Sequence, residues 1–214
     1  MSKNELTTEK MTQALGWAYE KALNGIPGDL SSESLAKSYM KRFSSTDEAI
    51  HSLIKWQTAK SSTSGFVTGL GGIVTLPVAV PVNIASVLYV QMRMIAAIAY
   101  MRGYDLKDDQ VQTFVFICLT GQAASDILKQ SGITVGTKLT VQLIKKVPGA
   151  TLTKINQKVA FRLVTKFGEK GVINLGKLVP VVGGVIGASV DGVGTKIIGN
   201  QANKLFVALD SSVI

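Results

Sequence analysis

The feature that most constrains how this chain can fold is an uncharged segment of 28 residues, which covers positions 65–92. About 20 apolar residues are enough for a helix to span a bilayer. Pro77 and Pro81 divide this segment, however, and its four glycines all precede the first proline. Because proline interrupts helices, the pattern predicts a Gly-rich part followed by a long apolar helix at 83–102, with Asn83 as its cap.

Two interpretations of this segment remain open. Small residues at short spacing let helix backbones approach closely, which suits a buried core hairpin as well as helices inside a membrane. A second Gly-rich apolar stretch, at 181–209, has the same character. If these stretches insert into a membrane, permanently or conditionally, the residues expected to take part are Gly69, Gly72, Pro77, Pro81, Gly183 and Gly187.

Elsewhere, apolar residues recur every three or four positions, which is the period of an amphipathic helix. Further helices are predicted at 1–24, 32–43, 46–61, 107–130, 133–147, 151–168 and 172–179. No sustained alternation of period two is present. The chain is therefore predicted to be all-α, a single helical domain whose central apolar helix packs against Gly/Pro-rich helical segments. Within it, we expect an N-terminal helical region at 1–55 and a main helical domain at 56–210.

Positive charge is concentrated in the second half of the chain. Residues 1–128 carry eleven Lys and Arg against eleven Asp and Glu, whereas residues 129–214 carry twelve against three. The whole formal net charge of +9 therefore lies in the last 86 residues. Such asymmetry suggests an anionic partner, either a membrane surface or a nucleic acid.

The predicted helix at 151–168 carries much of this charge. Its cations recur every four residues and continue just beyond it: Lys154, Lys158, Arg162, Lys166 and Lys170. This spacing places them along one side of a helix, beside an apolar stripe of Ile155, Val159, Leu163 and Phe167. The pattern fits a solvated face of a core-packed helix or a basic amphipathic helix on an anionic bilayer. On such a bilayer each cation contributes about 1 kcal/mol. Nucleic acid is disfavoured because no aromatic residues alternate with the cations to stack on bases.

Two lone charges, Arg93 and Asp191, interrupt apolar runs. A buried charge is costly unless it is paired. We hypothesise that the two pair with each other or that Arg93 pairs with a phosphate; the alternative is that both lie at the surface of their elements.

The sequence offers little for catalysis or cofactor binding. A single cysteine, Cys118, and a single histidine, His51, exclude an intramolecular disulfide and the common structural zinc sites within one chain. No nucleophile elbow, phosphate-binding loop or zinc-protease signature is present. We therefore expect no enzyme activity, no metal and no cofactor. The polar N-terminus lacks a signal peptide, so the expected compartment is the cytoplasm.

Several motifs resemble those of the EcsC family. They are the Gly/Pro-rich stretch 63–83, the stretch 91–105 ending in Gly-Tyr-Asp, the Lys-Phe-Gly-Glu-Lys-Gly block at 166–171, and the stretch 179–187. The similarity extends over about residues 56–206. The family takes its name from a protein encoded beside the two parts of an ABC transporter. The resemblance therefore implies a membrane transporter or another protein as a partner.

Together, these features predict a non-enzymatic module that docks on anionic lipid of the inner leaflet and supports a membrane transport complex. It is expected to be cytoplasmic, and either peripheral to the inner membrane or conditionally inserted into it. The alternative is a soluble helical protein-interaction module without lipid contact; an enzyme is the third choice. A nucleic acid is not expected as a partner.

Overall fold

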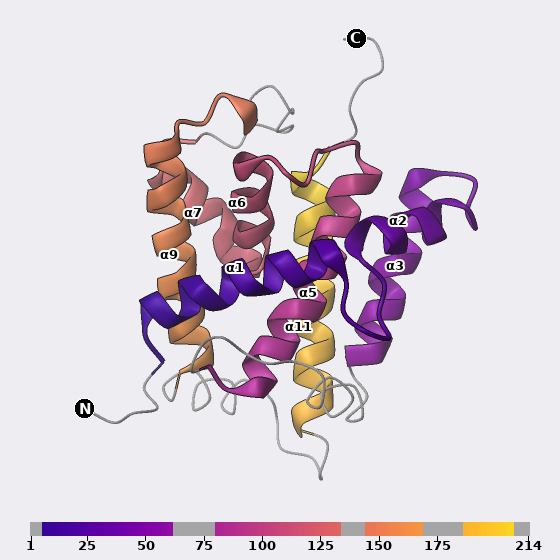
Figure 1. Ribbon diagram of the computed structural model, residues 1–214, viewed down its shortest axis with the longest axis horizontal. Helices are drawn as coiled ribbons and strands as arrows, with labels where there is room; N and C mark the ends of the chain where they lie inside the picture. The colour runs from indigo at the N-terminus through magenta and orange to yellow at the C-terminus, as the bar shows by residue number, and fades with distance from the viewer. Residues whose placement is uncertain (1–5, 62–79, 134–143, 169–185, 208–214) are drawn as a thin grey trace.

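The computed structural model describes residues 6–61, 80–133, 144–168 and 186–207, without the side chains of 61 and 186–192. Within these ranges the chain is helical and contains no strand, as predicted (Figure 1). The elements are α1 (Thr8–Asn24), α2 (Ser32–Met40), α3 (Thr46–Ser61), α5 (Val82–Met101), α6 (Asp109–Cys118), the 3₁₀ turn η1 (Gly121–Ala123), α7 (Ala124–Gln130), α9 (Gly149–Phe167) and α11 (Ile186–Leu205).

Helix α5 is the centre of the bundle, and helices α1, α2, α3, α6 and α11 all pack on it. Sixteen of its twenty residues are buried. Among the described residues it is also the one helix long and apolar enough to cross a membrane, but 83% of its apolar window is buried within the protein. The predicted central apolar helix is therefore confirmed as a core helix of this fold.

The ends of α5 differ slightly from the prediction. The helix begins at Val82, because the Pro81 carbonyl already accepts a hydrogen bond from the Ala85 N–H at 3.1 Å. Asn83 is exposed in the first turn, so the prediction that it caps the helix was wrong. At the other end, Gly103 adopts a φ of 89°, a conformation that glycine accepts at little cost and that stops the helix.

The N-terminal helices belong to the same core as α5. The side chains of Thr7 and Ser31 accept hydrogen bonds from the backbone N–H groups of Lys10 and Ser34, which fixes the starts of α1 and α2. The buried residues of α1, α2 and α3 form one hydrophobic cluster with those of α5. The described helices therefore make one domain, to whose core the N-terminal helices contribute.

The predicted helix at 107–130 is not continuous. It divides into α6 and α7, which are joined through η1, and the first residue of η1, Gly121, has a φ of 60°. Side chains with a Cβ rarely adopt this backbone conformation, so a glycine inside an apolar helical pattern marked the break. The basic helix predicted at 151–168 forms α9, and the Gly-rich stretch at 181–209 contains α11. The helix predicted at 172–179 and most of that at 133–147 lie outside the described residues.

A basic groove as the candidate functional site

Helix α9 buries one face and leaves its cations on the other. Of its predicted apolar stripe, Ile155, Val159 and Leu163 are buried, whereas Phe167 is only partly buried against the same core. Leu152, which the prediction did not include, extends the buried face. This stripe packs against α1, α6 and α7. Because the apolar stripe is fully used by the core, the charged side of α9 remains available at the surface.

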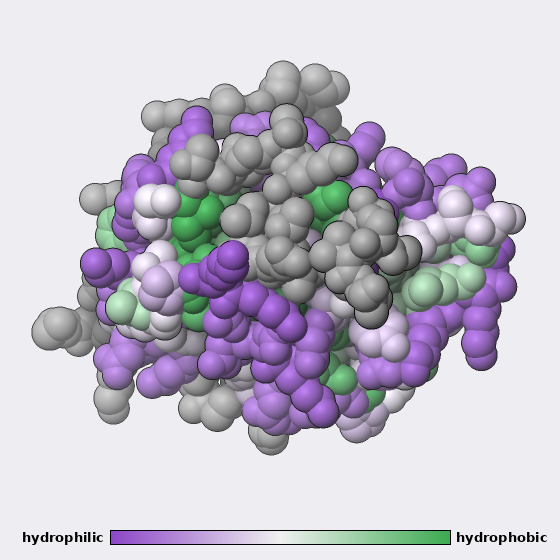
Figure 2. All heavy atoms as spheres, turned by 90° about the horizontal axis from the view of Figure 1, so that it is seen from above, coloured by the Kyte–Doolittle hydropathy of each residue, from purple (hydrophilic) through white to green (hydrophobic). Residues whose placement is uncertain are grey.

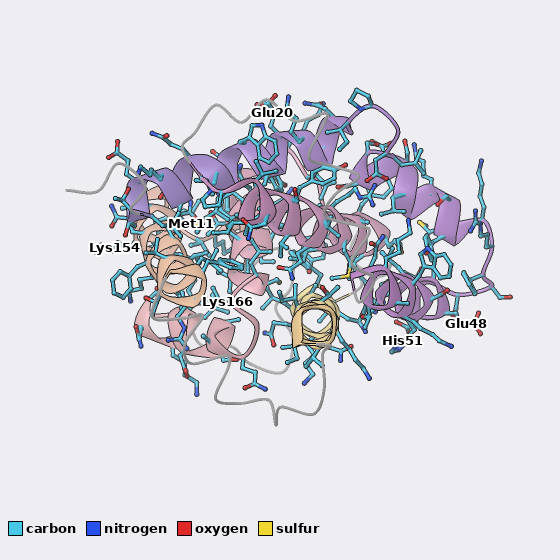
Figure 3. All side chains as sticks on the ribbon, turned by 90° about the horizontal axis from the view of Figure 1, so that it is seen from below. Met11, Glu20, Glu48, His51, Lys154 and Lys166 are labelled. Atoms are coloured by element: carbon cyan, nitrogen blue, oxygen red, sulfur yellow. The ribbon has the colours of Figure 1, made fainter. Side chains whose placement is uncertain are left out.

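The predicted cations of α9 have different environments. Lys154 and Arg162 are exposed and have no ion-pair partner among the described residues. Lys158 is half-buried, and its Nζ donates to the Gln130 carbonyl oxygen at 3.1 Å, at the C-terminal end of α7. Lys166 is half-buried, with its Nζ 5.2 Å from the centre of the Phe167 ring. Both Lys154 and Lys166 project from α9 in Figure 3.

Lys158 and Lys166 therefore have structural contacts, whereas Lys154 and Arg162 are the cations best placed to meet a ligand. Lys170, the last predicted member of the stripe, lies outside the described residues.

A groove of about 760 Å³ is lined by residues of α9 and α7, with Thr8 from the start of α1. Three predicted cations, Lys154, Lys158 and Arg162, line it. The other lining residues are Thr8, Ala123, Asp126, Ile127, Gln130, Gln157 and Phe161. The cations thus form one wall of a concave site, which the helical stripe alone did not predict.

Phe161 is the most exposed large apolar side chain of the groove, at 65% exposure. The sequence analysis missed it, although a signal was available. Phe161 falls outside the phase of the buried stripe and precedes Arg162 directly. A large aromatic side chain left at the surface beside cations is free to contact the apolar part of a ligand.

Arg93 is buried to 2% exposure and has an ion-pair partner that the sequence analysis did not name. Its guanidinium forms an ion pair with Asp29, in the loop between α1 and α2, and donates to the Leu30 carbonyl oxygen at 3.2 Å. Among the described residues, the ion-pair partner of Arg93 is therefore Asp29, and the hypothesised pair with Asp191 is not tested. Asp191 lies in α11, and its side chain is outside the described residues.

The surroundings of Arg93 form a small polar cluster within the core. Tyr89 donates its hydroxyl to Asp29 Oδ2 at 3.4 Å, and the Arg93 guanidinium carbon lies 5.6 Å from the centre of the Tyr89 ring. Burial raises the pKa of Tyr89 to about 12. Arg93 is therefore a structural charge that is paired within the protein, although its Nε has no hydrogen-bond partner among the described residues.

Most residues predicted to insert into a membrane lie outside the described residues: Gly69, Gly72, Pro77 and Gly183. Pro81 is exposed and directly precedes α5, and Gly187 lies in the first turn of α11.

The side chains considered for catalysis do not form a cluster. His51 is exposed on α3, whereas Cys118 is fully buried, and its burial raises the pKa of the thiol far above its usual range. Asp105 accepts a hydrogen bond from the Lys107 N–H at 2.9 Å, in the turn before α6. Over the described part of the chain, no three His, Cys, Asp or Glu side chains come together as a metal site requires.

Comparison with protein families matches residues 2–207 to the EcsC protein family. The match extends over the N-terminal helices, which the motifs noted in the sequence did not cover. Comparisons with curated proteins and with solved structures find no match.

Proposed function

The chain belongs to the EcsC protein family, and we propose that it is a non-enzymatic module that docks on anionic lipid at the cytoplasmic face of the inner membrane. Docking takes place through the charged side of α9, and the bound module supports a membrane complex such as a transporter. The contact is peripheral, since α5 is occupied in the core of the bundle.

One observation carries this proposal: α9 exposes Lys154, Arg162 and Phe161 together while its apolar stripe is buried. Cations on an amphipathic helix attract anionic lipid, and an adjacent aromatic ring gains free energy by entering the interface. The concentration of net charge in the second half of the chain adds a long-range attraction of the same sign.

Flotation with neutral and anionic vesicles, at low and high salt, tests the proposal. We expect binding to anionic vesicles alone, and release at high salt because salt screens exposed charges. The double variant Lys154→Glu with Arg162→Glu should lose binding, since both side chains are exposed and their replacement leaves the core intact.

A matched control makes the same change of charge on another part of the protein. Lys41 and Lys55 are both exposed and lie at the end of α2 and on α3. Their replacement by glutamate should leave most of the binding in place. Equal loss in both variants would mean that net charge, rather than α9, drives the interaction.

A second candidate function is a soluble protein-interaction module, and it rests on a different surface. Met40, Phe43 and Trp56 are exposed on or beside α2 and α3. Figure 2 shows apolar side chains among hydrophilic ones at this edge of the molecule. If flotation fails in every condition, in vivo cross-linking that is lost on replacing Met40 and Phe43 by serine would favour this function.

A further inference from the structure

The chemistry of the groove between α7 and α9 is mixed rather than purely cationic. Opposite the wall of Lys154, Lys158 and Arg162 stands Asp126, from the first turn of α7. The amides of Gln130 and Gln157 complete the polar lining. A flat electrostatic docking face needs none of these groups, and a carboxylate weakens it.

Each part of this lining selects a different part of a ligand. Lysine and arginine bind phosphate oxygens by charge-assisted hydrogen bonds. A carboxylate accepts hydrogen bonds from hydroxyl groups, and an amide can both donate and accept. Because the lining has three cations and one anion, the ligand should carry net negative charge.

We propose that the groove binds the headgroup of an anionic glycerophospholipid that carries free hydroxyls, as phosphatidylglycerol does. The phosphodiester contacts Lys154 and Arg162, and the glycerol hydroxyls donate to Asp126. This inference rests on the proposed function and adds to it a preference for one class of headgroup.

Two features favour a lipid over a free polyol phosphate. Phe161 lines the groove and is exposed, so a ligand with an apolar portion can cover it. The groove is open to solvent along the exposed side of α9, which leaves room for acyl chains to remain in the bilayer. A volume of about 760 Å³ lies within the range of ligand sites and exceeds the space that a phosphate alone requires.

The test compares vesicles of equal charge. Phosphatidylcholine vesicles with one third phosphatidylglycerol are compared with vesicles holding one third phosphatidylmethanol, because both headgroups carry one net negative charge and only the glycerol headgroup has hydroxyl donors. We expect binding to phosphatidylglycerol to be about fivefold tighter, the factor that one additional hydrogen bond provides. Asp126→Ala should abolish this preference while leaving binding to phosphatidylmethanol equal or stronger.

Glu20→Ala, which removes an exposed carboxylate from α1, serves as the charge-matched control and should retain the preference. The dependence on Asp126 separates headgroup recognition from diffuse attraction, since diffuse attraction rises for every anionic vesicle when either acid is removed.

The other possible outcomes distinguish failure of the headgroup site from failure of the docking function. Equal binding to both vesicles, or a preference that survives Asp126→Ala, overturns the headgroup site and leaves the proposed docking function standing. Binding to neither vesicle overturns the docking function itself. If free glycerol phosphate binds while vesicles do not, the ligand is a soluble metabolite and the assignment to a lipid is wrong.

Discussion

At the scale of single residues, Arg93 is the group whose environment matters most for the stability of the fold. It is the largest of the fully buried side chains in the described part of the chain. Its charge is compensated by Asp29, which belongs to a loop rather than to a helix packed beside it. Removing one partner of a buried ion pair leaves an uncompensated charge, which usually costs more than the pair contributed.

Replacing Asp29 by alanine should therefore destabilise the protein strongly. We expect the free energy of unfolding to fall by about 3 kcal/mol or more, the usual cost of breaking a buried pair. Denaturant titration monitored by circular dichroism measures this loss. The control is the double variant that also carries Arg93→Met, which should recover part of the lost stability because no charge is then buried alone.

The buried tyrosines should make the stability of the folded protein depend on pH in alkaline solution. Burial raises the pKa of Tyr89 to about 12, and burial also raises the pKa of Tyr104. An unfolded tyrosine has a pKa of about 10, so above that pH the unfolded state loses protons that the folded state retains. Stability is therefore full below about pH 10 and falls as the pH rises toward 12.

Thermal unfolding followed across this pH range checks the prediction, with tyrosinate absorbance as a second probe. We expect the melting temperature to fall while part of the tyrosinate signal is delayed until unfolding. Complete ionisation of the tyrosines in the folded protein near pH 10 would contradict it.

At the scale of elements, the contact between α3 and α11 depends on the absence of a side chain at Gly199. A Cβ at this position would lie 2.8 Å from Ile54 Cγ1 and 3.3 Å from Met94 Cε. Both neighbours are buried, so they have little room to move. The glycine thus lets α11 approach α3 and the central helix α5 at the same point.

Gly199→Ala should destabilise the protein despite the better helix propensity of alanine. Overpacking a core costs about 1–3 kcal/mol, whereas the gain in helix propensity is about 1 kcal/mol, so we expect a net loss. Gly194, in the same helix, has nothing within 4 Å of its Cβ position. Gly194→Ala should therefore be neutral or stabilising, and thermal denaturation of the two variants provides a matched comparison.

The sequence predicted elements better than it predicted contacts between them. Helices α5 and α9 could be placed because apolar residues, Pro81 and Gly103 mark their faces and ends over many positions. The burial of Arg93 could be anticipated from its apolar neighbours, but Asp29 could not be identified. Periodicity carries no information on which distant loop will cover a given helix face.

At the candidate site, too, the sequence predicted the helix face but not the contacts between helices. The spacing of the cations correctly placed Lys154 and Arg162 on the charged side of α9. The groove depends on how α7 lies beside α9, so Asp126 and Gln130 could not be assigned to it from helical spacing alone.

At the scale of the whole molecule, the two exposed surfaces of interest are well separated. Helix α9 lies at one side of the bundle, and α2 and α3 lie at the other (Figure 1). A protein docked through α9 therefore leaves Met40 and Phe43 accessible to a partner. This arrangement suits a module that connects a membrane surface to another protein.

Peripheral docking also makes a prediction about the central helix. Since α5 is enclosed by five helices, its amides should exchange with deuterium as slowly on phosphatidylglycerol vesicles as in solution. Exchange measured by mass spectrometry tests this, with α9 peptides expected to gain protection on binding. Salt-resistant flotation together with altered exchange throughout α5 would instead indicate that the helix inserts.

The pair between Asp29 and Arg93 also has a consequence for synthesis on the ribosome. Chains are made from the N-terminus, so the loop that carries Asp29 has already emerged when α5 leaves the exit tunnel. The partner of the buried arginine is thus available at once, whereas α11, which covers another face of α5, is made later than the other described helices. Until then, the nascent chain displays an apolar helix surface, and this interval is when a chaperone would be needed most.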